Sequence, residues 1–313
     1  MTKLFSHDFS QLTASDVETL KKYYKGYDYR GAGYTYLAHY IWRTTYCLQW
    51  EVIDGYLCMA GADCRGNGKD AVMSMPLTAD GTYDPVKLRS VILECKRRFD
   101  EIGVPLVIVT IPAHMVDILR EVFSEEELEL ERNRDYDEYV YLKEKLINLS
   151  GRALHKKKNH LNYFLRSFEY EAKPVTADMK QDIMALSEEI KKIKEMDPEE
   201  VDSLEHEYEA INEMIDAVDD PDVYSVAIFI KGKLQAFALG ERLSEDTAIE
   251  HFEKANDEYR GLYQLVCREF CLSLPEEVIY INREEDMGLE NLRQAKEALK
   301  PEYMEEKYFA SFK

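Results

Sequence analysis

The segment from Gly151 to Phe168 places polar and basic side chains at helical spacing. Its Arg152, Lys156, Asn159, Tyr163 and Arg166 recur every three or four residues and would therefore share one face of a helix. Cations and amide donors on one face suit phosphate or carboxylate groups. An ordinary solvated face of an amphipathic helix has the same pattern, so the spacing leaves both interpretations open.

A second segment, Thr247 to Asn256, combines a strand pattern with charge on both faces, at Glu250, His251, Glu253 and Lys254. Charge in a buried strand is costly unless it is paired or functional. If this strand diverges from its neighbour, a cleft opens in which Glu250 or Glu253 could act as a general base. The alternative is an edge strand with a salt-bridged surface.

A third polar segment follows the apolar strand expected at 278–281. Ligands of open α/β sheets bind beyond the carboxyl ends of strands. Asn282 and Arg283 lie at such an end, and Lys296 follows on the next helix, so these three could orient a substrate. The alternative is a helix-capping loop, with Asp286 as the cap.

The elements that must position these segments divide the chain into two halves. With 313 residues, of which 45% are hydrophobic, the chain has about the length of two domains. The net charge of −21 argues against duplex DNA as a partner. Residues 1–150 carry 18 basic and 24 acidic groups, and residues 151–313 carry 22 and 37. The basic run after Gly151, with five Lys or Arg and no acidic residue, thus lies in the more acidic half.

In the first half, 1–150, we expect a helix capped by Ser15 and Glu18, a hairpin turned at Asp54-Gly55, and then strand, helix, strand, helix and two strands. The expected ranges are 15–24, 47–53 with 56–60, 71–77, 85–102, 105–111, 113–123, 127–132 and 138–142.

The second half, 151–313, repeats this order after two helices. The expected ranges are 153–168, 177–195, 224–230 with 234–241, 247–255, 262–274, 278–281, 289–298 and 303–312. Residues 171–222 hold 18 acidic and five basic groups, and we expect them to form solvated helices, an insertion that acts as a lid. The repeated order predicts a duplicated α/β architecture with mixed sheets.

Several function classes lack their signatures. No P-loop, GxGxxG, GxSxG or HExxH pattern occurs. No apolar run is long enough for a membrane-spanning helix and the N-terminus does not resemble a signal peptide, so we expect a cytoplasmic protein. The cysteines form no CxxC pair and no metal-ligand spacing with histidine, which favours buried thiols in a reducing compartment and no metal site. They are Cys47, Cys58, Cys64, Cys95, Cys267 and Cys271.

The three polar segments together resemble a known bacterial family. GRALHKKKNHLNYF from Gly151, IEHFEKAN from Ile249 with Arg260-Gly-Leu-Tyr downstream, and NREEDMGLENLRQAK from Asn282 are similar to the phosphatidylglycerol lysyltransferase C-terminal-like proteins. The resemblance spans nearly the whole chain and implies two tandem GNAT (acyl-CoA N-acyltransferase-like) domains. Its better-known relatives transfer an amino acid from aminoacyl-tRNA to a lipid head group, and many members are soluble and stand alone.

The chain departs from this pattern at two points. It shows no membrane domain, and it lacks the Q/R-x-x-G-x-G/A loop by which acetyltransferases hold coenzyme A, of which Arg260-Gly261 retains a part. A helix that starts after Gly261 could still bind phosphate through its backbone N–H groups.

These observations predict acyl or aminoacyl transfer in the second half, to an amine or a hydroxyl, with a degenerate first half. Glu250 or Glu253 would be the catalytic base. The donor, acyl-CoA or aminoacyl-tRNA, would bind Arg152, Lys156, Lys158, Asn159, Arg260 and Gly261. The substrate would be held by Asn256, Asn282, Arg283 and Lys296. No tightly bound cofactor is expected.

The rival hypothesis is a non-catalytic module of the same fold that binds an anionic ligand or a protein partner. The incomplete coenzyme A loop favours the module, and carboxylates on an interior strand favour the enzyme. A cleft shared by Glu250 or Glu253 with Lys156 and Asn282 would support the enzyme.

Overall fold

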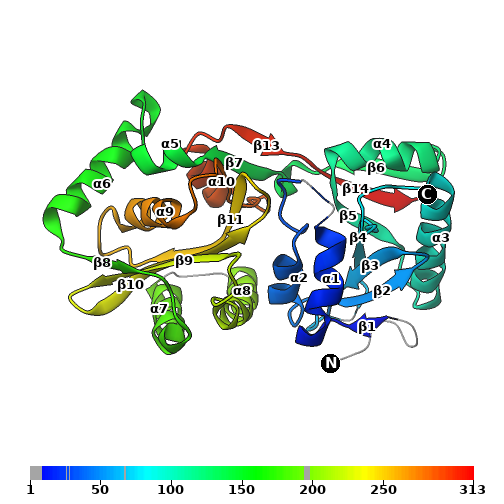
Figure 1. The fold of residues 1–313 in the computed structure, drawn as a ribbon, viewed down its shortest axis with the longest axis horizontal. Helices are drawn as coiled ribbons and strands as arrows, with labels where there is room; N and C mark the ends of the chain where they lie inside the picture. Colours follow the sequence, from blue (N-terminus) through cyan, green and yellow to red (C-terminus); the bar gives the residue numbers. More distant parts are fainter. Residues whose placement is uncertain (1–8, 26, 28, 67, 194–197) are drawn as a thin grey trace. The chain divides into compact units, whose positions relative to one another are not determined.

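The computed structural model describes residues 9–25, 27, 29–66, 68–193 and 198–313, and the side chains of 191–204 lie outside the description (Figure 1). The chain divides into two compact units. Unit 1 comprises Met1–Asp137 and Glu305–Lys313, and unit 2 comprises Glu138–Met304.

Unit 1 is built on one mixed sheet, and its only described parallel pairing joins β4 to β5. In spatial order the strands are β1 (Ser10–Gln11), β2 (Gln49–Ile53), β3 (Tyr56–Gly61), β4 (Val72–Ser74), β5 (Val107–Pro112), β14 (Lys307–Phe312) and β6 (Leu128–Arg132). Its helices are α1 (Val17–Tyr24), α2 (Tyr36–Trp42), α3 (Pro85–Glu101) and α4 (Ala113–Val122).

The helix ends in unit 1 follow local capping chemistry. The Asp84 carboxylate accepts hydrogen bonds from Val86 N and Lys87 N at the start of α3, where proline also occupies the first turn. Before α1, the capping box is formed by Thr13 and Asp16, so the expected pair Ser15 and Glu18 is wrong. The chain forms a short 3₁₀ turn before α1, which moves the cap two residues toward the N-terminus.

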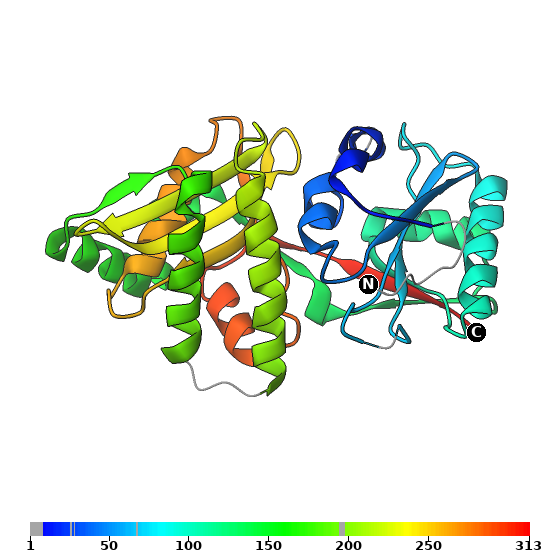
Figure 2. The ribbon, with the colours of Figure 1, turned by 90° about the horizontal axis from the view of Figure 1, so that it is seen from below.

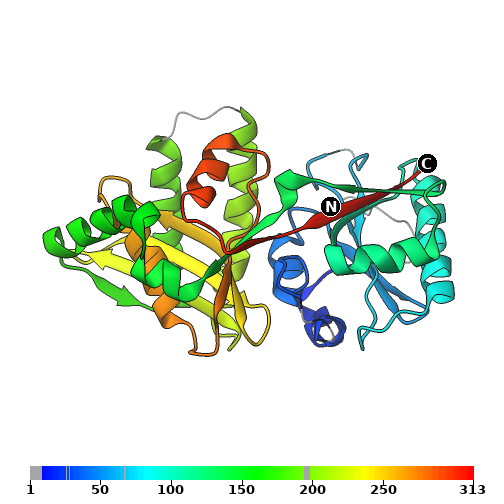
Figure 3. The same cartoon turned by 90° about the horizontal axis from the view of Figure 1, so that it is seen from above.

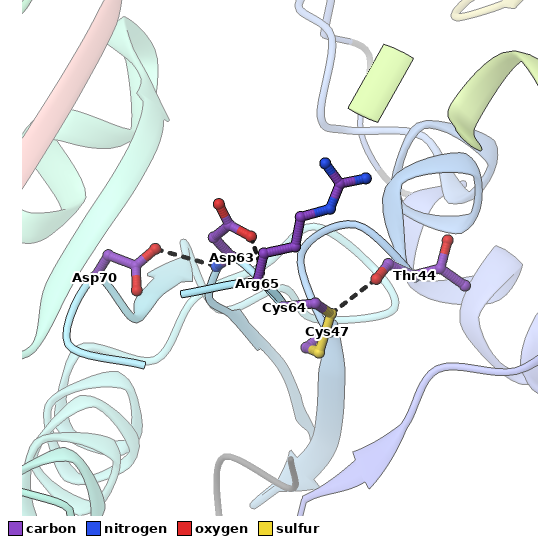
Figure 4. Close-up of a disulfide and its surroundings, with 6 residues drawn as sticks. All are labelled: Thr44, Cys47, Asp63, Cys64, Arg65 and Asp70. Carbon is purple, nitrogen blue, oxygen red and sulfur yellow. Dashed lines mark hydrogen bonds between the residues drawn. A yellow bond between two sulfur atoms is a disulfide. The ribbon is translucent and has the colours of Figure 1, made fainter. Parts of the chain in front are cut away.

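Cys47 and Cys64 form a disulfide beside the β2–β3 hairpin, so the expectation of free thiols is wrong for this pair (Figure 4). The hairpin returns the chain on itself, and main-chain hydrogen bonds from Ala62 N to Tyr46 O and from Cys64 N to Thr45 O align the two segments. This brings the two cysteine Cα atoms to 5.2 Å, a proximity that their spacing of 17 residues does not reveal. The free cysteines, all buried, are Cys58, Cys95, Cys267 and Cys271.

Unit 2 has a second mixed sheet, covered by helices on both faces. In spatial order its strands are β13 (Tyr303–Glu305), β7 (Glu138–Leu142), β12 (Tyr280–Asn282), β11 (Thr247–Ala255), β10 (Lys233–Arg242), β9 (Val223–Ile230) and β8 (Glu171–Lys173). Its helices are α5 (Lys143–Asn148), α6 (His155–Ser167), α7 (Lys180–Ile193), α8 (Pro198–Asp216), α9 (Leu262–Ser273) and α10 (Glu290–Glu297). Figures 1 and 3 show α5, α6 and α9 over one face, and Figure 2 shows α7 and α8 over the other.

The acidic stretch is a layer of unit 2, so the expectation of an added lid is not what the structure has. Its helices α7 and α8 bury an apolar stripe that includes Ile183, Leu186, Ile211 and Met214, each no more than 3% exposed. The acidic side chains that the structure describes on these two helices are exposed or half-buried, as in amphipathic helices. A net excess of charge therefore does not distinguish a mobile lid from a packed helix.

The two sheets share one order of pairing, and each receives one strand from beyond the expected boundary at residue 150. In each sheet, an edge strand is followed in space by an antiparallel hairpin, whose second strand leads to a third strand that pairs in parallel with its neighbour on the other side. The next strand is β14 in unit 1 and β7 in unit 2. β7 was expected to end the first half and β14 the second, but each pairs in the other unit. The division accordingly falls at Asp137 and Glu138, earlier than expected.

Candidate functional site

The sheet of unit 2 opens between β11 and β12. The two parallel strands pair only at Thr247–Tyr280, Ala248–Ile281 and Ile249–Asn282. β12 then ends, whereas β11 continues to Ala255. Glu250 and Arg283, the next residues of the two strands, therefore border a gap in the backbone pairing.

A β-bulge turns both candidate carboxylates to one face. Leu239 lies opposite Phe252 and the next residue, Gly240, opposite Glu250, so His251 is the extra residue. Because of this insertion, Glu250 and Glu253 both point to the α9 face although they are three apart. Gly240 permits the approach of the strands, since a Cβ there would lie 2.0 Å from Ile249 O.

Arg283 joins the two carboxylates across the gap. Its Nε lies 2.5 Å from Glu250 Oε2, and its Nη2 lies 2.9 Å from Glu253 Oε2. The side chain of Glu250 is 1% exposed and that of Glu253 is 13% exposed. Burial raises the pKa of Glu250 well above its ordinary value, an effect that Arg283 opposes and the Glu253 carboxylate increases. Glu253 is thus the more accessible of the two carboxylates.

The same cluster contains side chains of the types that bind metal ions. Glu250, Glu253 and Cys267 bring one possible ligand atom each to within 4.8 Å of one another. The Arg283 guanidinium already compensates both carboxylates, and a side-chain hydrogen bond with Cys271 and burial raise the pKa of the Cys267 thiol. A neutral thiol beside a guanidinium suits an ion-pair centre and does not fit a bound cation.

Lys157 of α6 is near enough to this cluster for Arg283 and Glu253 to act on its pKa, and the sequence interpretation did not include it. Leu161 and Phe164 form the buried stripe of α6, and Leu154, in the 3₁₀ turn before the helix, continues it. Lys157 falls on this stripe, half-buried, three residues after Leu154 and four before Leu161. Burial and then Arg283 lower the pKa of Lys157. The signal in the sequence was a lysine at an apolar position of the helical repeat.

The outer side of α6 is basic. Arg152, Lys156, Lys158 and Asn159 are exposed and line a shallow hollow together with His155. No described residue forms an ion pair with any of these three cations, whereas acidic partners are frequent elsewhere in the chain. This face is therefore an uncompensated positive surface on an acidic protein.

Arg260 and Gly261 adjoin α6. The Arg260 guanidinium lies over the Tyr163 ring, 5.2 Å from its centroid. Gly261 caps α9 with φ of 95°, and a Cβ there would lie 2.2 Å from His160 O. The start of α9 is thus packed against the backbone of α6.

Three of the expected substrate-binding residues have structural partners instead. Asn282 is fully buried and donates to Glu138 Oε2 at 2.6 Å, on the face opposite Glu250. Lys296 donates to Arg283 O at 2.5 Å and to Glu285 O. Asn256 donates to Gln235 Oε1 at 2.9 Å. The shared cleft expected for Glu250, Lys156 and Asn282 is therefore not formed with Asn282. The α6 cations and the carboxylates do lie on one side of the sheet.

On the other face of the bulge, His251 contacts two glutamate side chains. Its Nδ1 lies 2.7 Å from Glu284 Oε1 and its Nε2 lies 2.9 Å from Glu241 Oε1. Burial lowers the pKa of His251, but Glu284 and Glu241 outweigh it and raise the value to about 10. The imidazolium therefore donates to both carboxylates at neutral pH and fixes the residue that follows Arg283.

We expect the stability of the protein to fall as the pH rises from about 6.5, the unfolded pKa of histidine, toward 10. The folded-state pKa is raised, so the stabilisation is complete below this range and is lost through it. The loss is on the order of a few kcal/mol. Urea unfolding at pH 6 and pH 9.5 measures it, and His251→Gln should flatten the dependence. His155→Gln, at an exposed histidine, is the control. If the free energy of unfolding falls equally between pH 6 and pH 9.5 in wild type and in His251→Gln, the ion pairs of His251 are not the cause of the pH dependence.

Comparison with known proteins gives the family. A model of the C-terminal region of phosphatidylglycerol lysyltransferase matches residues 24–311. The chain belongs to this family. An uncharacterised protein of Mycoplasmoides gallisepticum is 25% identical over 170 residues, and the match spans about half of that relative, 54% of its length and 54% of this chain.

Solved structures show the fold of this family member. A conserved protein of unknown function from Bacteroides thetaiotaomicron superposes with a TM-score of 0.83 at 27% identity, over 97% of this chain and 99% of that one. A tandem GNAT protein from the clavulanic acid biosynthesis pathway superposes with a TM-score of 0.52 at 11% identity, over 97% and 98%. The two units are thus tandem GNAT-like domains, and the predicted fold class is confirmed.

Within the described residues, no helix of this family member has the length and apolar character needed to cross a membrane.

Proposed function

We propose that unit 2 transfers an aminoacyl group from aminoacyl-tRNA to an amine or a hydroxyl, at the gap between β11 and β12. The observation that carries this proposal is the Glu250–Arg283–Glu253 cluster, which lies at the gap on the same face as α6. The family supports transferase chemistry, and the proposal adds the donor and the residues.

The basic face of α6 favours a donor with many phosphates. Arg152, Lys156 and Lys158 are exposed and carry no described ion pair, as is expected of side chains that neutralise a nucleic-acid backbone. At the start of α9, where a coenzyme A pyrophosphate would need free N–H groups, Leu262 N already donates to Tyr259 O, and Asp257 and Glu258 precede this turn in the sequence. These features favour aminoacyl-tRNA over acyl-CoA.

Glu253 would take the proton of the acceptor as it attacks the ester carbon. Glu250 is too deeply buried to meet the acceptor, but with Arg283 it fixes the direction of the Glu253 carboxylate. Alignment of acceptor and ester can supply about 7–11 kcal/mol of the barrier, and no covalent intermediate is required.

The test supplies two donors with one small acceptor. Total tRNA charged with radiolabelled amino acids, or acetyl-CoA, is mixed with hydroxylamine and the purified protein, and the hydroxamates are separated from the background reaction. We expect acceleration with aminoacyl-tRNA only. Acceleration with acetyl-CoA alone would replace the proposed donor, and acceleration with neither would favour the non-catalytic binding module.

The basic face makes a separate prediction about binding. The double variant Arg152→Ala/Lys158→Ala should bind uncharged tRNA more weakly, because each lost phosphate contact removes counterion release. The plot of log affinity against log salt should become less steep by about one unit per lost contact. Filter binding at several salt concentrations measures this. Lys87→Ala, at an exposed lysine of unit 1, is the control. An unchanged salt dependence in the double variant would show that tRNA does not bind to the basic face of α6.

A further inference from the structure

Lys157 differs from its neighbours on α6 in direction and in partners. Lys156 and Lys158 are exposed, whereas Lys157 is half-buried on the buried stripe of α6, the helix that packs against α9. The charged groups that act on it are Arg283, Glu253 and Lys156, with the Cys267 thiol beside them. No described residue lies within ion-pair distance of its amine, although Lys254 of β11 is paired with Glu207 at 2.6 Å.

We infer that the Lys157 ammonium group is the general acid of the transfer and protonates the ribose oxygen of the donor as it leaves; this inference rests on the proposed function. Lys157 lies on the half-buried side of α6, whereas the tRNA phosphates would lie on the outer side, and it interacts electrostatically with Arg283 and Glu253, where the acceptor would be deprotonated. The ester end of a donor that passes from the outer side to these carboxylates would meet Lys157.

The step balances in atoms and protons. The acceptor forms a bond to the ester carbon, and its proton goes to the Glu253 carboxylate. The bond from the ester carbon to the ribose oxygen breaks, and the Lys157 ammonium gives a proton to that oxygen. The proton on Glu253 then restores the ammonium. The products are the acylated acceptor and tRNA with a free terminal hydroxyl, and nothing is oxidised or reduced.

The other cation of the cluster cannot serve in this way. Arg283 is occupied by two carboxylates, and a guanidinium does not release its proton in proteins. Burial lowers the pKa of Lys157, which makes its ammonium a better proton donor, and Arg283 adds to the effect. The position of Lys157 and its lowered pKa therefore both favour its amine nitrogen as the proton donor.

Lys157→Arg separates proton donation from charge, because arginine keeps the charge but retains its proton. With hydroxylamine as acceptor, two donors are compared: aminoacyl-tRNA, whose alkoxide leaves poorly, and an aminoacyl thioester of N-acetylcysteamine, whose thiolate leaves without a proton. We expect a loss of about 10²–10⁴-fold with aminoacyl-tRNA and of less than about tenfold with the thioester. The affinity for uncharged tRNA should stay at the wild-type value.

The remaining outcomes are distinct. Equal losses with both donors, no loss with aminoacyl-tRNA, or a weakened affinity for uncharged tRNA that accounts for the loss would each overturn the role of Lys157 while the proposed function stands. A wild-type protein that accelerates neither donor contradicts the proposed function itself. Lys180→Arg is the matched control for Lys157→Arg, since the half-buried Lys180 of α7 pairs with Asp216 of α8, away from the cluster. Melting temperatures of both variants verify folding.

Discussion

Replacement of Arg283 by methionine is expected to lower the free energy of unfolding by about 3–5 kcal/mol at pH 8. The change leaves Glu250 and Glu253 without their shared cation, 1% and 13% exposed. Burial already raises the pKa of Glu250, and removal of Arg283 raises it further. A raised pKa means that a larger fraction of Glu250 is protonated at pH 5 than at pH 8, so the loss should be smaller at pH 5. Urea unfolding at the two pH values measures both numbers.

A second substitution tests the cause. Glu250→Gln in the Arg283→Met background removes the buried charge and should recover most of the lost stability, since a neutral amide needs no cation. Arg268→Met, which breaks a partly exposed pair with Glu269, should cost less than about 1 kcal/mol. If the double variant is as unstable as Arg283→Met, lost packing of the guanidinium, and not the unpaired charge, is responsible.

Glu253→Gln is expected to reduce the transfer rate by about 10²–10⁴-fold, because the amide keeps the shape of the side chain but cannot accept the acceptor's proton. Stability should change little, since Arg283 keeps its contact with Glu250. The measurement is the initial rate of hydroxamate formation from aminoacyl-tRNA, with the melting temperature beside it.

Two further variants interpret the result. Glu276→Gln, at an exposed glutamate remote from the cluster, should transfer at the wild-type rate. Glu250→Gln should also transfer more slowly, through a less well directed Glu253. If Glu250→Gln abolishes transfer while Glu253→Gln does not, the base is Glu250 and the assignment is wrong.

Most elements of the fold could be predicted from local sequence, because their signals are local. β11 is observed at Thr247–Ala255, as expected, and α3 begins at Pro85, as its turn signal indicates. The pairing of β7 and β14 could not be predicted in this way. Each has an ordinary strand pattern, and the choice of sheet depends on partners more than 100 residues away.

The site was predictable in part. Charge on an interior strand indicated Glu250 and Glu253, but only the bulge at His251 turns them to one face. Asn282 lay at a favourable strand end, yet the pleat directs it to Glu138 on the opposite face. Lys157 was not predicted, because the run of three lysines fits an exposed helix face. Only the position of Lys157 on the apolar stripe distinguishes it from the other two.

The position of β14 bears on the order in which the protein forms during synthesis. This strand lies between β5 and β6, yet it leaves the ribosome after every residue of unit 2. Until then the nascent chain presents two strand edges of unit 1 without their partner, a state open to wrong pairing. In unit 2 the corresponding strand, β7, is synthesised before the rest of the unit, so its pairing partners do not have to wait for it. The candidate catalytic domain can thus fold cotranslationally, and the other domain closes last.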